Sequence, residues 1–424
     1  MLYSIVSLSG LLVMLGLAWA CSTNRRRVPW GLVAKGVLLQ FAFAWIVLKT
    51  EAGRGFFDGA GRAIQFVLDA SKEGTRLIFG ALAQPEVLGP AMGDAEKYGF
   101  VFFIHVTGTI ILVSALMSAL YYVGVMQWVV WAMAKIMQVV LGTSGSESLA
   151  AAANVFVGQT EAPLVIKPYL PRMTQSEIMA LMTGGMATIA GGVMAAYAGM
   201  LVAAGFDRGP GDLLAASIMS APASLVIAKI MVPELEQSET RGAVRVRVER
   251  EGSNLLDAIC IGAADGLKLA LNVMAMLIAF TALVYLVNSV LRVVGAQFHI
   301  DDLTLERIFG FAMRPLALAM GVPPDESATV GAILGKRTIL NEFFGYIDLA
   351  TEYKAGHLSE RSAMITTYAL CGFANFASIA IQIGGIGSLV PSRRADLARL
   401  GLRAMIGGTL ASYMTANIAG ALVG

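Results

Sequence analysis

Eight stretches of the chain are apolar over a length that suits a membrane-spanning helix, which needs about 20 mostly apolar residues. They are residues 2–21, 29–49, 99–123, 176–205, 211–231, 257–291, 362–389 and 403–423. Several are long enough to tilt or to break. No Lys or Arg precedes the first stretch, so we expect a retained helix rather than a cleaved signal peptide. The pattern predicts a single membrane domain over residues 1–424, an all-α polytopic fold with eight transmembrane helices.

Two further segments have the pattern of helices that lie on the membrane surface. Residues 54–80 alternate charged and bulky side chains at helical spacing, which indicates an amphipathic interfacial helix over about residues 54–82. Residues 126–141 are apolar and carry Trp128 and Trp131, and Trp side chains favour the depth of the membrane–water interface.

Residues 146–170 are too short to cross the membrane twice. The apolar run up to Val157 is about 12 residues, or about 18 Å of helix, roughly half of a hydrocarbon core of about 30 Å. Gly158 then supplies a stop, Thr160 can cap a new helix, and Pro163 is tolerated in its first turn. The segment predicts a re-entrant helical hairpin that turns round inside the membrane. Its polar tip consists of Gln159, Thr160 and Glu161.

Residues 324–353 predict a second re-entrant hairpin. Pro323 and Pro324 open it. Asn341 can cap its second half, and Glu342 falls in the first turn of that half.

Each hairpin is followed by a helix that Gly, Asn or hydroxyl residues interrupt, at 186–199 and at 371–385. An odd number of membrane crossings separates the two copies, so they form an inverted repeat. Inverted repeats with broken helices that meet at the membrane midplane are the architecture of secondary transporters. Non-helical backbone at that depth is tolerated only where it is buried in protein or lines an aqueous cavity.

Composition agrees with a membrane protein: 57% of the 424 residues are hydrophobic and 14% are charged, against about 25% charged in soluble domains. The net charge of +2 leaves no basic surface suited to a nucleic acid polymer. The scattered cysteines and histidines offer no disulfide framework, metal site or catalytic nucleophile. They are Cys21, Cys260, Cys371, His105, His299 and His357. We therefore expect neither an enzyme nor a bound cofactor.

Lys and Arg positions predict the orientation. Residues 25–27 are all Arg and follow the first helix, which places that loop in the cytoplasm and the N-terminus outside. Successive spanning helices cross in opposite directions, which places residues 245–250 and 392–403 in the cytoplasm and the C-terminus outside. Lys336 and Arg337 fall on the outer side, against the rule.

Ionisable groups inside a bilayer are costly and usually functional, which singles out Glu161 and Glu342. A helix N-terminus favours a carboxylate in its charged form, so both suit a ligand rich in donors, such as sugar hydroxyls or the N–H groups of a base. Gln159 offers an amide that pairs with the edge of a planar heterocycle. Asn375 and Ser378 are three apart, hence on one face of a helix if it persists there.

Several other residues each have two possible interpretations. Asn154 and Thr188 suit either sodium ligands beside backbone carbonyls freed at helix breaks or ordinary interhelical hydrogen bonds. Phe373 suits either an apolar surface for a ring or helix packing. Asp265 with Lys268 is either a structural ion pair or a gate. His105 is either a packed residue or a proton relay.

Three blocks resemble the concentrative nucleoside transporter family. They are "GTSGSESLAAAANVFVGQTEAPLVIKPY" (142–169), "GKRTILNEFFGY" (335–346) and "CGFANFASIAIQIGG" (371–385). Their order and spacing agree with the family over nearly the whole chain, and the helix count resembles that of the bacterial members. The resemblance implies a sodium-coupled symporter that imports nucleosides (uridine, cytidine, adenosine or analogues) across the bacterial inner membrane.

The resemblance also implies a homotrimer in which each protomer works as an elevator within the lipid bilayer. A scaffold part at about 1–50, 99–141 and 268–295 would make the trimer contacts. A transport part at about 142–231 and 322–424 would carry both hairpins and move.

The family pattern further implies roles for individual residues. The first hairpin would contact the nucleobase through Gln159, Thr160 and Glu161. The ribose would be held by Glu342, Asn375 and Ser378, with Phe373 lining the pocket. Val193 matches a position near the base where members differ in purine and pyrimidine preference.

The implied sodium ligands are the side chains of Asn154 and Thr188 and the carbonyl groups of Val157 and Ile189. Sodium-coupled members usually carry Ser at position 188, and Thr adds a methyl group there. Two alternatives stay open: a proton-coupled nucleoside symporter, and a membrane-embedded hydrolase that uses Glu161 and Glu342 as acid and base.

Overall fold

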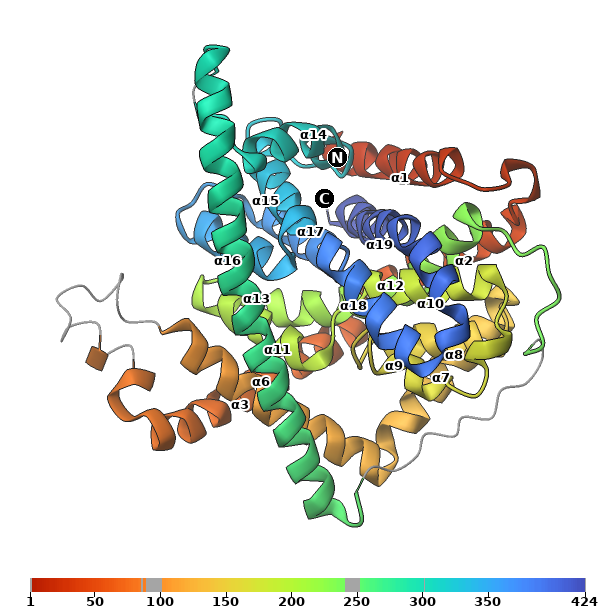
Figure 1. Ribbon diagram of the computed structural model, residues 1–424, viewed down its shortest axis with the longest axis horizontal. Coiled ribbons are helices and arrows are strands. Elements are labelled where there is room, and N and C mark those ends of the chain that lie inside the picture. Colours follow the sequence, from red (N-terminus) through yellow and green to blue (C-terminus); the bar gives the residue numbers. More distant parts are fainter. Residues whose placement is uncertain (1, 85–86, 89–100, 241–251, 301, 424) are drawn as a thin grey trace.

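The computed structural model describes residues 2–84, 87–88, 101–240, 252–300 and 302–423, and all regular elements in them are helices (Figure 1). The N-terminal half contains α1 (Leu2–Ala20), α2 (Trp30–Lys49), α3 (Glu51–Phe79), α6 (Phe102–Val123), α7 (Val125–Leu141), α8 (Gly145–Asn154), α9 (Ala162–Val165), α10 (Gln175–Ala187), α11 (Gly191–Ala203) and α12 (Gly209–Met231). The C-terminal half contains α13 (Leu255–Gln297), α14 (Leu305–Ala319), α15 (Ser327–Ile339), α16 (Glu342–Lys354), α17 (Glu360–Leu370), α18 (Phe376–Leu389) and α19 (Arg394–Leu422). Short 3₁₀ turns occupy Arg25–Arg27, Gly80–Ala83, Leu170–Arg172 and Pro391–Arg393.

Six segments of the described chain are long and apolar enough to cross a membrane by length and composition alone. They are α1, α2, α6, the α10–α11 pair, α12 and α13. The other two predicted spans are α17–α18, which an interruption divides, and α19, which packs among α1, α10, α12, α17 and α18. An enclosed helix needs less apolar surface than one that faces lipid, so α19 is long without being strongly apolar. The fold is that of a polytopic, all-α membrane protein.

The long helix α13 stands apart from the tightly packed centre. Its 43 residues correspond to about 65 Å, so it exceeds the hydrocarbon core of about 30 Å. Figure 1 shows it running past the other helices at both ends. It packs mainly on α6, and apolar side chains such as Leu286, Val290 and Val293 remain exposed along it.

The centre of the molecule is formed by α10, α12 and α19, whose small residues let the backbones approach closely. A Cβ atom at Gly408 of α19 would lie 2.7 Å from the Cβ atom of Met186 on α10. At Gly36 of α2, it would lie 2.1 Å from a methyl carbon of Val226 on α12. Side chains larger than hydrogen do not fit at either contact.

The first hairpin departs from its predicted details. Gly158 is not the stop, because α8 already ends at Asn154, and tertiary donors take the carbonyl groups that follow it. Ser217 Oγ donates to the Val155 carbonyl at 3.1 Å, and the Gly191 amide donates to the Phe156 carbonyl at 3.0 Å. A glycine cap is therefore not needed.

The second arm of this hairpin is short, since α9 has four residues. Thr160 does not cap it, which corrects the prediction: its hydroxyl donates instead to Glu161 Oε1 at 2.9 Å. Glu161 occupies the N-cap position and makes no side-chain cap bond there.

The second hairpin follows its prediction closely. Asn341 is the N-cap of α16, and its side chain accepts from the Phe344 amide at 3.3 Å. Glu342 is therefore the first residue of α16, which fixes its carboxylate at the turn between α15 and α16.

One helix of the described chain was not expected from the hydropathy pattern. The amphipathic helix α14 packs against α15 and contains Pro315 within it. The helix expected at residues 257–291 is α13, which begins two residues earlier and ends six residues later. The amphipathic helix α3 and the helix α7 are present as predicted, and the loop 245–250 lies outside the described residues.

The two cations that contradict the charge rule are both held within the protein. Lys336 Nζ lies 2.6 Å from Asp348 Oδ2, which joins α15 to α16. Arg337 is fully buried and donates to the Gly372 carbonyl and to Ser412 Oγ, each at 3.3 Å. Neither is a solvated loop charge, so neither bears on the orientation.

Candidate functional site

The break after α8 lies against the break between α10 and α11. The Gly191 amide, which begins α11, donates to the Phe156 carbonyl at 3.0 Å. Both interruptions therefore meet in the protein interior, where their free backbone groups face each other rather than lipid. Figure 1 places α8, α9, α10 and α18 together in this part of the fold.

Asn154, the last residue of α8, has an unusual environment. Its side chain is 1% exposed, yet neither its Oδ1 nor its Nδ2 has a hydrogen-bond partner. It lies beside Gly184 of α10, whose carbonyl accepts from Thr188 Oγ1 at 2.9 Å. A buried amide without a protein partner costs about 1–3 kcal/mol.

Two backbone carbonyls lie in the helix breaks that follow Asn154 and Thr188 in the chain. Val157 and Ile189 each lie in a helix break, and no donor among the described residues bonds to either carbonyl oxygen. Thr188 donates its proton to Gly184, which leaves its hydroxyl oxygen free to accept or to coordinate. All four groups offer oxygen atoms, which are the ligands that suit a hard cation such as sodium.

The second broken helix places Asn375 at the N-cap of α18. Its Oδ1 accepts from the Ser378 amide at 2.9 Å, and its Nδ2 donates to Glu342 Oε2 at 3.1 Å. Asn375 and Ser378 are therefore joined by a cap. A shared helix face required the helix to continue through Asn375, and α18 instead begins at Phe376. The cap turns the Asn375 amide toward Glu342.

Glu342 is buried and bonded from both sides. Its Oε1 accepts from the Tyr197 hydroxyl at 2.7 Å, and the Tyr197 ring stacks on Tyr346 with 4.3 Å between ring centres. Tyr197 was missed at the level of sequence, although it lies four residues after Val193 and so on the same face of α11. This contact joins the broken helix of the first half to the hairpin of the second half.

Gln159 completes the network from the first hairpin. Its Nε2 donates to Ser378 Oγ at 3.2 Å, and its Oε1 accepts from Gln382 Nε2 at 3.0 Å. Gln382 was also missed. It is fully buried and lies four residues after Ser378, so a search for polar positions along one face of the broken helix would have found it.

The remaining predicted residues lie around this network. Glu161 is exposed and bonded to Thr160, which packs against Gly385 of α18. Val193 is buried at the start of α11, and Phe373 is half-buried in the break before α18.

Comparisons with known proteins assign the chain to a family. Residues 9–82 and 212–420 match the family models described as the N-terminus and C-terminus of "Na+ dependent nucleoside transporter", and residues 103–204 match one described as "Nucleoside recognition". The chain is 41% identical to the nucleoside permease NupC of Helicobacter pylori, over 99% of this chain and 98% of that protein. The chain belongs to the concentrative nucleoside transporter family.

Other members of the family are similarly close. The sodium/nucleoside cotransporter 1 of Rattus norvegicus is 40% identical over 99% of this chain, which spans 64% of that longer protein. A structure of CNTnw in an inward-facing substrate-bound state superposes with a TM-score of 0.88 at 39% identity, covering 99% of this chain and 98% of that one. Because the family consists of transporters, the hydrolase alternative is set aside.

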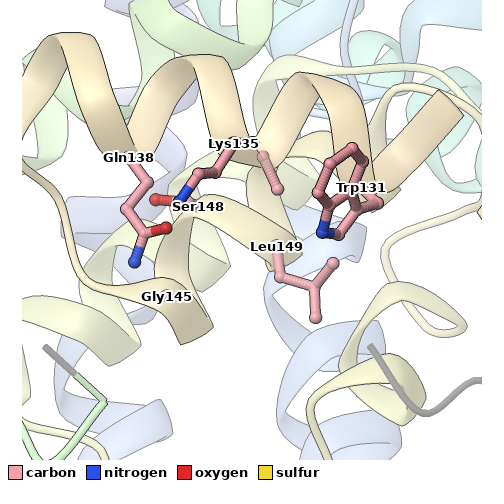
Figure 2. Close-up of a pocket in the computed structure, with 7 residues that line it drawn as sticks. Trp131, Lys135, Gln138, Gly145, Ser148 and Leu149 are labelled. Carbon is pink, nitrogen blue, oxygen red and sulfur yellow. The ribbon is translucent and has the colours of Figure 1, made fainter. Parts of the chain in front are cut away.

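The transporter also has a small cavity outside the network just described. Figure 2 shows it between α7 and α8, with a volume of about 30 Å³. That volume holds about one or two water molecules and is far too small for a nucleoside. Its lining residues are Trp131, Ala134, Lys135, Gln138, Gly145, Ser148 and Leu149.

The three residues whose roles the sequence left open, Asp265, Lys268 and His105, lie outside the network and make local contacts. Lys268 Nζ lies 2.9 Å from Asp265 Oδ1 on α13, and both side chains are exposed, at 74% and 56%. His105 Nδ1 lies 3.0 Å from the Val101 carbonyl of its own helix turn. In the described part of the transporter, no group of three or more His, Cys, Asp or Glu side chains could hold a metal.

Proposed function

We propose that this protein is a sodium-coupled symporter that imports nucleosides across the bacterial inner membrane, with both termini outside. The observation that carries the sodium coupling is Asn154, a buried amide without protein partners that lies beside Gly184, the residue to which the Thr188 hydroxyl bonds. The relatives' names support the same ion, since the matching family models are described as Na+ dependent.

The nucleoside would lie between the first hairpin and α18. Gln159, Thr160 and Glu161 would contact the base, with Val193 beneath it. Glu342, Asn375 and Ser378 would hold the ribose, with Phe373 covering the sugar. These polar groups bond to one another. The Gln159 amide and the Glu342 carboxylate each have more donor or acceptor positions than these bonds use, so the hydroxyl and N–H groups of a nucleoside would bind at the remaining positions.

The ion and the substrate would be coupled through the first hairpin. Val157 and Gln159 are two residues apart, so a cation held by the Val157 carbonyl fixes the backbone that carries Gln159. A fixed hairpin tip loses less conformational freedom when the base binds, which gives positive coupling between the two ligands.

Movement would follow an elevator mechanism in a homotrimer. The scaffold part (about 1–50, 99–141 and 268–295) would make the trimer contacts, and the exposed apolar side chains of α13 are suited to such a contact or to lipid. The transport part (about 142–231 and 322–424), which carries both hairpins, would slide across it.

The test is uptake of labelled uridine into proteoliposomes, with sodium and pH gradients imposed separately. We expect accumulation of intact uridine with an inward sodium gradient at equal pH on both sides. Accumulation with a pH gradient alone, and none with sodium, would assign the alternative of proton coupling. The same assay with cytidine, adenosine and inosine would define the substrate range.

A further inference from the structure

Gln382 of α18 is fully buried and uses both hydrogens of its side-chain amide. Its Nε2 donates to the Met182 carbonyl of α10 at 3.0 Å and to Gln159 Oε1 at 3.0 Å. The Met182 carbonyl is an acceptor only, so the end of the Gln382 amide that faces it must be the nitrogen. A backbone group therefore sets the orientation of Gln382.

The orientation of Gln382 then determines that of Gln159. The atom of Gln159 that faces Gln382 Nε2 must be an acceptor, so it is Oε1, and Nε2 points the other way to Ser378 Oγ at 3.2 Å. The backbone position of Ser378 is fixed in turn, because its main-chain N–H donates to Asn375 Oδ1. The direction of every bond follows from donor and acceptor chemistry rather than from the shape of the side chains.

Packing holds the two glutamine side chains together. A Cβ atom at Gly185 of α10 would lie 2.8 Å from Gln159 Cβ and 2.8 Å from Gln382 Nε2. On α18, Ser378, Gln382 and Gly385 lie on one face at i, i+4 and i+7, and Gly385 meets the Thr160 side chain of the same hairpin tip. The first hairpin is seated on this face with little room for the amides to move.

We propose that Gln382 is a positioning residue that controls nucleobase selection by holding the Gln159 amide in one orientation. The proposal rests on the proposed function, in which Gln159 contacts the base. Uracil and cytosine present opposite donor and acceptor patterns on their pairing edges, as do hypoxanthine and adenine. An amide fixed in one orientation distinguishes such pairs, whereas an amide free to rotate by 180° accommodates both members.

The test compares Gln382→Met with wild-type transporter. Methionine has nearly the same length and volume but neither donates nor accepts strongly. Inhibition constants against labelled uridine uptake are measured for the pairs uridine and cytidine, and inosine and adenosine. We expect wild type to discriminate within at least one pair by about threefold or more, as one hydrogen bond allows, and the variant to bring that ratio close to one.

The control is Gln40→Met. Gln40 of α2 is also fully buried, donates to a backbone carbonyl at 3.3 Å and has an unpartnered Oε1, so the same substitution removes the same chemistry elsewhere. We expect it to leave the base ratios unchanged. The ratio of uridine to 2′-deoxyuridine should change much less in Gln382→Met, because Glu342 and Asn375, which would hold the ribose, bond to each other and not to Gln159 or Gln382.

A second variant covers the case in which Gln382→Met does not fold. Gln382→Leu also removes the amide that donates to Gln159 but has a different shape, and it should bring the base ratio toward one as well. Two outcomes would overturn the proposal. One is that the variants weaken the inhibition by all nucleosides equally, and the other is that the base ratios stay unchanged although folded protein is as abundant as in wild type. Gln159→Ala distinguishes failure of the proposed base contact from failure of the Gln382 role. If Gln159→Ala also leaves the base ratios unchanged, Gln159 does not contact the base. If only Gln159→Ala changes the base ratios, Gln159 contacts the base and Gln382 does not position it.

Discussion

At the scale of single residues, Glu342 has partners that fix both of its oxygens. The Tyr197 hydroxyl bonds to Oε1 and the Asn375 amide bonds to Oε2. A carboxylate held in this way presents its remaining lone pairs in a fixed direction, and bonds to a charged acceptor contribute about 1.5–3 kcal/mol each.

We therefore expect Tyr197→Phe to raise the KM for uridine by about tenfold, because Glu342 loses one of the bonds that orient it. The matched control is Tyr346→Phe, since Tyr346 stacks on Tyr197 but donates its hydroxyl to the Thr367 carbonyl at 3.0 Å. Both variants lose one buried hydroxyl, and only the first should change KM. Equal KM values for the two variants would show that Tyr197 does not act through Glu342.

Asn154 leads to a prediction about stability. Because its buried amide has no partners, Asn154→Ala removes a desolvated group, and we expect the sodium-free melting temperature not to fall below that of wild type. Sodium should stabilise wild type, since a ligand that binds only the folded state adds RT ln(1 + [L]/Kd), and it should not stabilise the variant.

The control for this prediction is Thr183→Val on α10, which also removes a buried, unpartnered polar atom. That variant should keep the sodium-dependent rise in melting temperature. A sodium response retained in Asn154→Ala would remove Asn154 from the proposed ion site.

At the scale of elements, the second hairpin is formed by α15 and α16 around Leu340 and Asn341. In a background without native cysteines, Leu340→Cys should react with an impermeant external thiol reagent at a rate that nucleoside and sodium together change by about threefold or more, if the hairpin gates the outer side. The measurement is labelling of intact cells or right-side-out vesicles.

The control is Ile300→Cys, on the exposed connection between α13 and α14. Its labelling should be rapid and independent of ligands. Ligand-independent labelling at both positions would argue against a gating movement of the second hairpin.

At the scale of the whole molecule, one chain contains every residue of the proposed site, including Asn154, Gln159, Glu342 and Gln382. In the proposed homotrimer, each protomer should therefore work alone. Native mass spectrometry should first show three copies of the 44.7 kDa chain.

Wild-type chains mixed with inactive Glu342→Gln chains should then give uptake that falls linearly with the fraction of variant chains. A decline with the third power of the wild-type fraction would mean that all three protomers must be intact, which would contradict independent pathways. Equal expression of the two chains is verified with different tags.

The sequence alone determined the class of fold, the two hairpins and the position of Glu342 at the start of a half-helix. These features depend on local physics: transfer of apolar side chains into lipid, helix length and capping each involve residues close together in the chain. The cap by Asn341 and the breaks after Ala187 and Leu370 were predictable for that reason.

Only the tertiary structure decided which partners these residues meet. Tyr197 and Glu342 are 145 residues apart and Gln159 and Gln382 are 223 apart, so no local pattern links them. The end of α8 at Asn154 likewise depends on donors from α11 and α12. A buried polar group bonds to whichever donor or acceptor the packing of distant helices brings within about 3 Å, and that choice is made by the fold as a whole.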